Sequence, residues 1–183
     1  MLIAIDGLAG SGKSSTAKLL STKLNYKCLD TGSMYRALTY IILKHKIMLN
    51  DLKSINNFII DLSFEIKYNN DEMLLLCNGE DVTKYIRSEK VSDNVSYISS
   101  LIECRKRMVS AQRDIVGDSN FVVEGRDIGT VVFPEADYKF FLTADINTRS
   151  SRRLNQFETL LNVNEIKNNI INRDNDDSSR NVS

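Results

Sequence analysis

Residues 7–14, near the start of the chain, are of the types that bind a phosphate chain. They read Gly7, Leu8, Ala9, Gly10, Ser11, Gly12, Lys13 and Ser14, and match G-x-x-x-x-G-K-[S/T] at every fixed position. Glycines let such a loop turn its backbone N–H groups inward, and the helix that follows adds partial positive charge. The lysine of this pattern reaches the β and γ phosphates, and its serine hydroxyl binds Mg²⁺. The segment therefore predicts a site for the phosphate chain of a nucleotide and for Mg²⁺, which extends to Ser15; by itself it leaves GTPases, ATPases and small-molecule kinases open.

The residues on either side of this loop favour the strand and the helix that a phosphate loop requires. Residues 2–5 form a continuous apolar run, which is typical of a buried strand. Apolar residues then recur at helical spacing from position 17 to 24, Asn25 is a typical helix end, and residues 26–29 predict a second strand. A glycine-rich turn arising by chance is the alternative explanation. The order of strand, loop, helix and strand argues against it.

Beyond residue 30, helices and strands alternate except in one antiparallel region. Phe64, Ile66 and Tyr68 alternate with polar residues and residues 73–77 return as a strand, so residues 63–87 predict a small antiparallel insert. The other expected elements are helices at 33–46, 51–61, 90–115, 147–157 and 163–173, and strands at 121–123 and 138–142. This alternation predicts an α/β fold of three layers, with a parallel sheet between helices.

The length and charge balance of the chain restrict its class. At 183 residues it is expected to form a single domain, 1–183. Its 24 Lys and Arg residues equal its 24 Asp and Glu residues, so no excess of basic charge favours binding to nucleic acid. No apolar run approaches the roughly 18 residues of a membrane span. We therefore expect a soluble intracellular protein that binds neither nucleic acid nor membrane.

The cysteine and histidine content excludes several kinds of catalysis. Cys28, Cys77 and Cys104 are odd in number and widely spaced, which fits neither a disulfide framework nor a C-x-x-C motif, so we expect reduced thiols in the cytoplasm. His45 is the only histidine, which excludes His-rich metal sites and Ser-His-Asp triads. Any catalysis must therefore use Lys, Arg, Asp, Glu and backbone groups.

Two further segments narrow the choice among proteins with a phosphate loop. The N-K-x-D sequence with which GTPases read their base is absent. Residues 30–36, DTGSMYR, resemble the D-[ST]-G-x-x-Y-R segment of the cytidylate kinases, and residues 124–134, EGRDIGTVVFP, resemble that family's second signature. With the loop and the insert, the resemblance covers nearly the whole chain in order. It implies a P-loop NTPase fold and the phosphorylation of CMP and dCMP by ATP with Mg²⁺.

The resemblance implies a set of residues for the acceptor nucleotide. Thr31 is similar to the family's residue that touches cytosine, Arg36 is similar to the one that grips the 5′-phosphate of CMP, and Tyr35 lies in the same segment. Ser96 resembles a serine at the pentose, and Arg105 resembles an arginine beside the cytosine. A guanidinium fork suits a phosphate. The alternative for Arg36 is a surface residue on a helix, and without the resemblance residues 105–107 would be interpreted as a solvated basic face.

The second signature places charged residues directly after a predicted strand, where ligands bind in open α/β folds. Arg126 is expected to neutralise phosphate. Asp127 is expected to accept a hydrogen bond from the amino group of cytosine, which uracil lacks. Glu124 stands where a carboxylate would hold Mg²⁺ through water, and the alternative for it is a salt-bridged strand end.

The resemblance also implies a short helical lid at about residues 145–157. Arg149, Arg152 and Arg153 lie in this lid, and Arg149 and Arg152 share a helical face. The lid arginines would close over the transferring phosphoryl group, where positive charge stabilises the charge spread over its oxygens. We therefore expect Lys13, Arg149 and Arg152 to act in catalysis together with the phosphate-binding arginine of the second signature.

The last residues of the chain match the family's R-x-x-x-D-x-x-R spacing. Arg173 and Asp177 are similar to pentose contacts, and Arg180 is similar to a residue that faces the base or the phosphate. The family continues beyond the position of Ser183 with a further strand and a terminal helix. We therefore expect this chain to expose apolar surface and an open sheet edge, and to be less stable than a longer relative.

Two other functions stay open. Another kinase with the same loop, acting on UMP, AMP or a non-nucleotide substrate, would keep Lys13 but should lack the pattern of Thr31, Arg105 and Asp127. A non-catalytic nucleotide-binding protein would bind ATP and CMP without turnover. We expect a monomer, because nothing in the sequence marks an interface.

Overall fold

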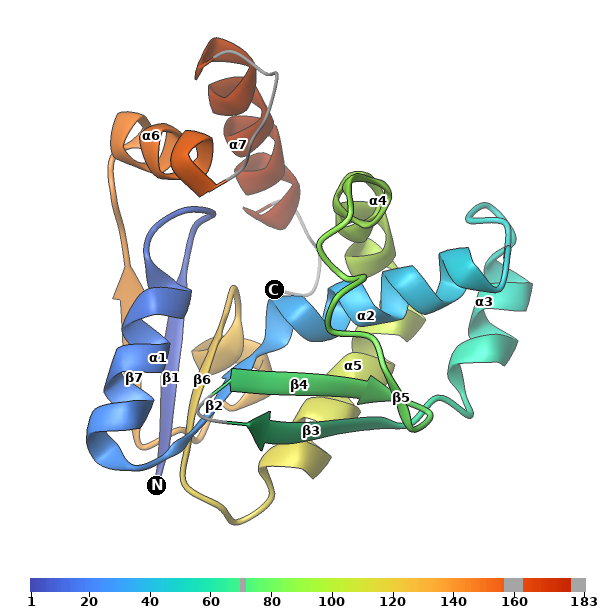
Figure 1. Cartoon of the computed structure of the whole chain (residues 1–183), viewed down its shortest axis with the longest axis horizontal. Helices are drawn as coiled ribbons and strands as arrows, with labels where there is room; N and C mark the ends of the chain where they lie inside the picture. The colour runs from blue at the N-terminus through green and yellow to red at the C-terminus, as the bar shows by residue number, and fades with distance from the viewer. Residues whose placement is uncertain (70–71, 157–162, 179–183) are drawn as a thin grey trace. The chain divides into compact units, whose positions relative to one another are not determined.

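The computed structural model describes residues 1–69, 72–156 and 163–178 (Figure 1). The chain divides into two units. The first joins Met1–Cys28 to Phe121–Ser183, and the second is Leu29–Asn120. The phosphate loop therefore lies in the first unit, and the antiparallel insert lies in the second.

A parallel sheet forms the centre of the first unit. Strand β1 (Leu2–Gly7) pairs in parallel with β6 (Phe121–Gly125) on one side and with β7 (Tyr138–Leu142) on the other. Strand β2 (Lys27–Asp30), whose first two residues belong to this unit, completes the order β2-β6-β1-β7. Helices cover both faces of parallel sheets, which is why β1 and β6 read as nearly continuous apolar runs. The predicted α/β fold is confirmed.

Helix α1 (Lys13–Leu24) follows the phosphate loop and packs on the sheet. Its Ala17 is fully buried in a cluster with side chains of β1 and β6. The helix ends at Asn25, whose φ of 54° is left-handed and whose N–H donates to the carbonyl of Thr22 at 3.3 Å. Asparagine is one of the few residues that adopts this conformation readily, so the predicted helix end is confirmed.

Two further helices of the first unit pack against each other and against the phosphate loop. They are α6 (Ile146–Gln156) and α7 (Val163–Ser178). Ile166 and Ile170, one turn apart on α7, are buried against Ala9 of the loop. This small apolar cluster fixes α7 directly beside the loop.

An aspartate caps the first turn of α6. Asp145 accepts hydrogen bonds from the backbone N–H of Thr148 at 3.0 Å and from its hydroxyl at 2.5 Å. These hydrogen bonds lower the pKa of the Asp145 carboxyl. They also satisfy an N–H group that the start of a helix leaves without a partner, which sets where α6 begins.

Strand β7 lies at an edge of the sheet and exposes large apolar side chains. Tyr138 is 54% exposed, Phe140 50% and Phe141 63%. An edge strand with apolar side chains is a surface on which another strand can pair.

The second unit combines helices with a small antiparallel sheet. Its elements are α2 (Thr31–Lys44), α3 (Leu52–Ile59), β3 (Phe64–Asn69), β4 (Glu72–Cys77), β5 (Glu80–Asp81), α4 (Glu89–Ser100) and α5 (Ile102–Val116). The sheet has the order β3-β4-β5, and its strands fall within residues 63–87. Among the described residues of both units, no helix is both long and apolar enough to cross a lipid bilayer.

The prediction of one continuous helix over residues 90–115 is wrong. The chain breaks at Leu101, whose ψ of 124° is extended, and α4 and α5 are separate helices. The Ser99 hydroxyl donates to the Ser96 carbonyl at 3.0 Å, and the Ser100 hydroxyl donates to the Tyr97 carbonyl at 2.7 Å. Serine hydroxyls that bond the preceding turn compete with the helical hydrogen bonds, which explains the break.

Candidate active site

The phosphate loop joins β1 to α1 and needs glycine at two close approaches. A Cβ atom on Gly7 would lie 2.3 Å from the carbonyl oxygen of Leu142, at the end of β7. Gly10 has a φ of +73°, and its Cβ would lie 3.1 Å from the carbonyl oxygen of Arg149 on α6. Glycine therefore lets a neighbouring strand and the lid helix come close to the loop.

Polar side chains of the loop are turned toward its own backbone. Lys13 is buried, and its ammonium group donates to the Leu8 carbonyl at 3.0 Å. Ser11 is also buried, whereas Ser15 is exposed on α1. A cationic side chain in a glycine-rich loop at the start of a helix suits a bound polyphosphate.

Ser14 and Glu124 meet at the start of α1 and the end of β6. The Ser14 hydroxyl donates to Glu124 Oε1 at 2.5 Å, and Glu124 is 4% exposed. Hydroxyl and carboxylate oxygens are the ligands that Mg²⁺ prefers, and it binds through few protein groups when substrate phosphates supply the rest. Within the described residues no group of three or more His, Cys, Asp and Glu side chains is placed to hold a metal. The pair therefore fits a magnesium ion shared with a nucleotide.

Asp6, at the end of β1, is a residue of this site that the sequence analysis missed. Its carboxylate accepts hydrogen bonds from the backbone N–H groups of Ile128 at 2.7 Å and Gly129 at 2.8 Å. Burial raises the pKa of the Asp6 carboxyl, and the nearby charge of Asp127 adds to the effect. A single carboxylate ending an apolar strand is the signal that points to it. Asp6 thus holds the segment that follows β6.

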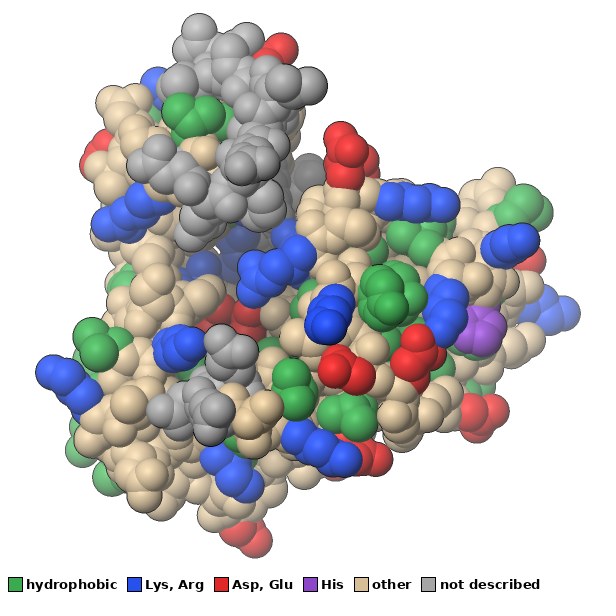
Figure 2. All heavy atoms as spheres, in the orientation of Figure 1, with side chains coloured by type: hydrophobic (Ala, Val, Ile, Leu, Met, Phe, Trp, Pro, Cys, Tyr) green, Lys and Arg blue, Asp and Glu red, His purple; other side chains and the backbone are tan. Residues whose placement is uncertain are grey.

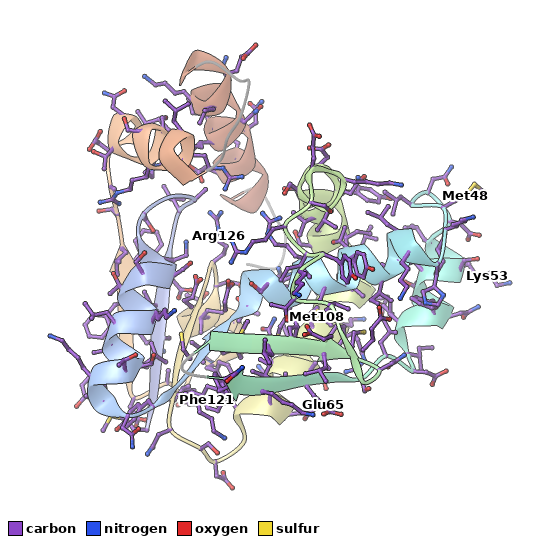
Figure 3. The ribbon with its side chains drawn as sticks, in the orientation of Figure 1. Met48, Lys53, Glu65, Met108, Phe121 and Arg126 are labelled. Atoms are coloured by element: carbon purple, nitrogen blue, oxygen red, sulfur yellow. The ribbon has the colours of Figure 1, made fainter. Side chains whose placement is uncertain are left out.

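That segment carries Arg126 and Asp127 and continues into a π-helical turn, η1 (Ile128–Val132). Arg126, labelled in Figure 3, is half-buried, and its Nη1 lies 3.5 Å from a carboxylate oxygen of Asp174. Asp127 is 8% exposed, and its carbonyl accepts the N–H groups of Val131 and Val132. Both side chains therefore have fixed surroundings directly after the strand.

The lid helix α6 brings two arginines onto the phosphate loop. Arg149 Nη1 donates to the Ala9 carbonyl at 3.2 Å, and Arg152 Nη1 donates to the carbonyl of Ser11 at 3.0 Å. Arg153 is half-buried, and burial lowers the pKa of its guanidinium, with a smaller effect from the positive charge of Arg126. Three arginines thus bring positive charge to the region of the loop.

Asp174 on α7 is the second site residue that the sequence analysis missed. Its carboxylate accepts a hydrogen bond from Arg149 Nη1 and one from the Ala9 N–H at 3.4 Å. Ile166, Ile170 and Asp174 follow one another at intervals of four residues, so they share one face of α7. The apolar cluster against the loop was the signal that could have located this carboxylate.

The remaining residues proposed near the end of the chain are only partly described. The backbone of α7 includes Arg173 and Asp177, but their side chains lie outside the described residues. Arg180 lies outside the described residues altogether.

In the second unit, Thr31, Tyr35 and Arg36 lie on the first two turns of α2. Asp30 caps this helix, because its carboxylate accepts the Ser33 N–H at 3.0 Å and the Ser33 hydroxyl at 2.6 Å. Thr31 is therefore the first residue of the helix, and it is buried.

Arg36 is held by contacts within the second unit. Its Nη1 donates to the Ser92 hydroxyl on α4 at 2.9 Å and to the Ile86 carbonyl at 3.4 Å. Tyr35 beside it is half-buried. Arg36 is therefore a positioned side chain rather than a freely solvated one.

The basic cluster at residues 105–107 divides into three different environments. Arg105 is 6% exposed, and Lys106 is exposed and pairs with Glu103 at 2.8 Å. Arg107 donates to the carbonyls of Ile59, at 3.3 Å, and Leu62. A uniformly solvated basic face is thus the wrong reading of this cluster, and Arg105 is distinct from its neighbours.

Ser96 and His45 both lie in the second unit, and they differ in exposure. Ser96 is half-buried on α4, one turn after the serine that binds Arg36. His45 is exposed, the purple side chain in Figure 2, and its ring packs against Phe58 with centroids 4.9 Å apart. The lone histidine therefore packs at the end of α2, which agrees with chemistry based on arginine, lysine and carboxylates.

The candidate residues thus form two groups, one in each unit. Those of the first unit surround the phosphate loop, and those of the second lie on α2, α4 and α5. Each group is ordered by contacts inside its own unit.

The sequence of this chain is similar to proteins described as cytidylate kinases. The family model described as cytidylate kinase matches residues 3–183. The chain is 42% identical over 186 residues to the cytidylate kinase of Clostridium tetani (strain Massachusetts / E88), covering 100% of this chain and 80% of that protein. It is 40% identical to the cytidylate kinase of Carboxydothermus hydrogenoformans, covering 100% of this chain and 84% of the relative.

A relative of a different kind is a longer protein. The bifunctional pantoate ligase/cytidylate kinase of Prochlorococcus marinus (strain MIT 9301) is 45% identical over 187 residues, which cover 100% of this chain. The chain spans only 37% of the length of that relative.

Proposed function

This chain belongs to the cytidylate kinase family, and we propose that it transfers the γ-phosphoryl group of ATP to CMP and dCMP. The observation that carries the proposal is the arrangement at the phosphate loop, where buried Lys13 contacts the Leu8 carbonyl and Ser14 is hydrogen-bonded to Glu124. The products would be ADP with CDP or dCDP.

The reaction is proposed to depend on position and charge. A phosphate oxygen of CMP attacks the γ-phosphorus in line with the departing ADP oxygen, so that one P–O bond forms as another breaks. Such a step needs little acid–base chemistry from the protein, because the main requirements are alignment and neutralisation of charge. This suits a chain whose only histidine lies outside the proposed site.

In the first unit, residues 7–15 hold the phosphate chain of ATP and Lys13 neutralises its β and γ phosphates. Ser14 and Glu124 would hold Mg²⁺, Glu124 through water, and a metal ion there would supply charge neutralisation to the phosphate oxygens of the nucleotide. The short hydrogen bond between the two side chains supports this assignment.

Arg149 and Arg152 stabilise the charge on the transferring group, and Arg153 adds positive charge to the same lid. Their supporting observations are the bonds from Arg149 and Arg152 to the loop carbonyls. Arg126 neutralises phosphate from the end of β6. The lid is proposed to exclude water, which would otherwise hydrolyse ATP.

The acceptor is held by charged and polar residues. Arg36 binds the 5′-phosphate of CMP, Thr31 and Arg105 contact the cytosine, and Ser96 contacts the pentose. Tyr35 adds to this pocket. The partial burial of Arg36 and the burial of Arg105 support these roles, because a desolvated guanidinium binds an anion or a carbonyl more strongly.

Asp127 supplies the base specificity of the proposed reaction. Its carboxylate accepts a hydrogen bond from the cytosine amino group, which uracil replaces with a carbonyl. Arg173 and Asp177 contact the pentose, and Arg180 faces the base or the phosphate; these three roles rest on the resemblance.

The protein is proposed to work as a monomeric domain of the cytoplasm, with an insert at about 63–87 and a lid at about 145–157. Burial raises the pKa of the Cys77 and Cys104 thiols to about 11, which keeps them protonated and unreactive. Cys28, like these two residues, is not in a disulfide.

The experiment that tests the function is phosphoryl transfer from Mg-ATP to CMP, dCMP, UMP and AMP. Turnover confined to CMP and dCMP is the expected result. Equal or greater turnover of UMP or AMP would assign another nucleotide kinase. Binding of ATP and CMP without turnover would assign a non-catalytic binding protein.

A further inference from the structure

Asp174 lies among the groups that are proposed to bind phosphate. Its carboxylate accepts the N–H of Ala9 at 3.4 Å, pairs with Arg149, and lies 3.5 Å from Arg126 Nη1. Ala9 belongs to the phosphate loop, and both arginines belong to the charged groups that surround it. We propose that the Asp174 carboxylate is an internal competitor of the ATP phosphate chain, which ATP must displace in order to bind.

Asp174 and an ATP phosphate would compete because the same few N–H donors, on Ala9 and Arg149, are available to both. A carboxylate and a phosphate oxygen carry the same charge and accept from the same N–H groups. The single hydrogen of the Ala9 N–H cannot make two strong bonds at once. The Nη1 of Arg149 is likewise already shared between Asp174 and the Ala9 carbonyl. A nucleotide phosphate entering the loop therefore meets donors that already have an anionic partner.

The Arg149–Asp174 ion pair is largely buried, which strengthens its competition with a bound phosphate. Arg149 is 6% exposed, and the Asp174 side chain is 12% exposed, so salt and water screen the pair weakly. The Nε of Arg149 is buried and has no hydrogen-bond partner among the described residues. The guanidinium thus keeps one donor for a ligand while another holds Asp174.

The fold keeps Asp174 at the loop through apolar packing rather than through charge alone. Ile166 and Ile170 are buried against Ala9, and Asp174 follows on the same face of α7. The helix therefore presents the carboxylate to the loop even without a nucleotide. Displacing Asp174 requires either a rotation of its side chain or a shift of α7.

The test is the affinity for Mg-ATP of the whole chain with Asp174→Asn, measured by isothermal titration calorimetry. Asparagine keeps the size of the side chain and removes its charge. We expect ATP to bind about tenfold more tightly, within the range usual for coupling between two sites. Glu165→Gln removes the same charge from an exposed position of α7 and should leave the affinity unchanged. Unchanged or weaker binding by Asp174→Asn would overturn the proposal.

A measurement on the unaltered protein covers the case in which the variant does not fold. The side-chain carboxyl ¹³C resonance of Asp174 should shift when Mg-ATP is added, because the ion pair with Arg149 is broken. A resonance that stays in place at saturating ATP would mean that Asp174 is not displaced.

The inference rests on the proposed function, and the two can fail separately. If the unaltered protein phosphorylates CMP but Asp174→Asn gains no affinity for ATP, the proposed function stands and the role of Asp174 as a competitor is wrong. If neither form binds ATP, both proposals are wrong.

Discussion

The two units of this chain carry proposed binding residues of two different kinds. In the first unit, the residues proposed for ATP are backbone N–H groups and side chains of residues 7–15, which are contiguous in the sequence. In the second unit, the residues proposed for the acceptor are side chains from three helices, α2, α4 and α5. A backbone site can be encoded by a short motif, because the motif itself sets the turn. A side-chain site needs its helices packed before its residues form a group.

The two units also differ in how their arginines are held. Arg149 and Arg152 of the first unit donate to carbonyls of the phosphate loop itself. Arg36 of the second unit donates to Ser92 and Ile86, which belong to other elements. In the first unit, these arginines are therefore held by the phosphate loop itself. In the second unit, Arg36 is held by residues outside its own helix.

Replacing Lys13 by alanine should have the largest effect. We expect kcat to fall by about a hundred- to a thousandfold, because one preorganised cationic donor to a developing phosphate charge contributes on that scale. The measurement is steady-state phosphoryl transfer from Mg-ATP to CMP, with circular dichroism to verify folding.

Lys18→Ala, on the same helix but exposed, is the control for this change and should keep full activity. Unchanged turnover by Lys13→Ala would show that Lys13 does not act in the reaction, and would contradict the catalytic role of the loop motif.

Replacing Arg36 by alanine should act on the acceptor rather than on ATP. The KM for CMP should rise roughly 10- to 100-fold, since a hydrogen bond to a charged group contributes about 1.5–3 kcal/mol. The KM for ATP should stay near its original value. Initial rates with each substrate varied in turn provide the measurement.

Arg87→Ala, at an exposed position of the same unit, is the matched control. Arg36→Lys should recover only part of the affinity, because an ammonium group lacks the planar fork. An equal rise of the KM for CMP and the KM for ATP in Arg36→Ala would contradict the proposal that the second unit binds only the acceptor.

Replacing Asp127 by asparagine should relax the choice of base. The amide presents a donor as well as an acceptor, so the ratio of kcat/KM for CMP over UMP should fall roughly tenfold, the contribution of about one hydrogen bond. Competition between CMP and UMP in one reaction gives the ratio directly. Asp118→Asn, at an exposed position, should leave it unchanged, and an unaltered ratio in Asp127→Asn would assign the base contact elsewhere.

Replacing Asp6 by asparagine should destabilise the first unit. One acceptor oxygen becomes an amide donor facing the N–H of Ile128 or Gly129, so one buried N–H loses its partner at a cost of about 1–3 kcal/mol. Urea unfolding measures the loss. Asp137→Asn is the control, because its carboxylate is exposed and accepts one hydrogen bond, from Leu2. Equal stability of Asp6→Asn and the unaltered protein would contradict the positioning role of Asp6.

The smallest effect is expected at the start of the lid helix. The hydrogen bonds from Thr148 lower the pKa of Asp145, so the stabilisation is present above the unfolded pKa near 3.8 and is lost as the pH falls through the folded value. Asp145→Ala should therefore lower Tm slightly at pH 7, and the difference from the unaltered protein should shrink as the pH falls through the folded pKa. A Tm difference that stays constant with falling pH would show that the charge of this carboxylate does not stabilise the helix.

The sequence by itself determined the phosphate loop, the α/β class and the family. The glycines, Lys13 and Ser14 specify the loop through local backbone conformation, and Asn25 specifies the helix end for the same reason. The buried apolar runs located β1 and β6, although both strands extend two residues beyond the predicted ends. These features depend on interactions between residues close in the chain, and a single sequence displays them fully.

Only the tertiary structure decided the rest. Leu101 separates two helices where apolar spacing predicts one, because serine hydroxyls bond the preceding turn. Arg105 is buried while Lys106 beside it is exposed, because helical neighbours face different directions. Asp6 and Asp174 entered the site through partners more than 100 residues away in the chain. A local pattern can single out a residue such as Asp6, but its partners at such separations are decided by packing.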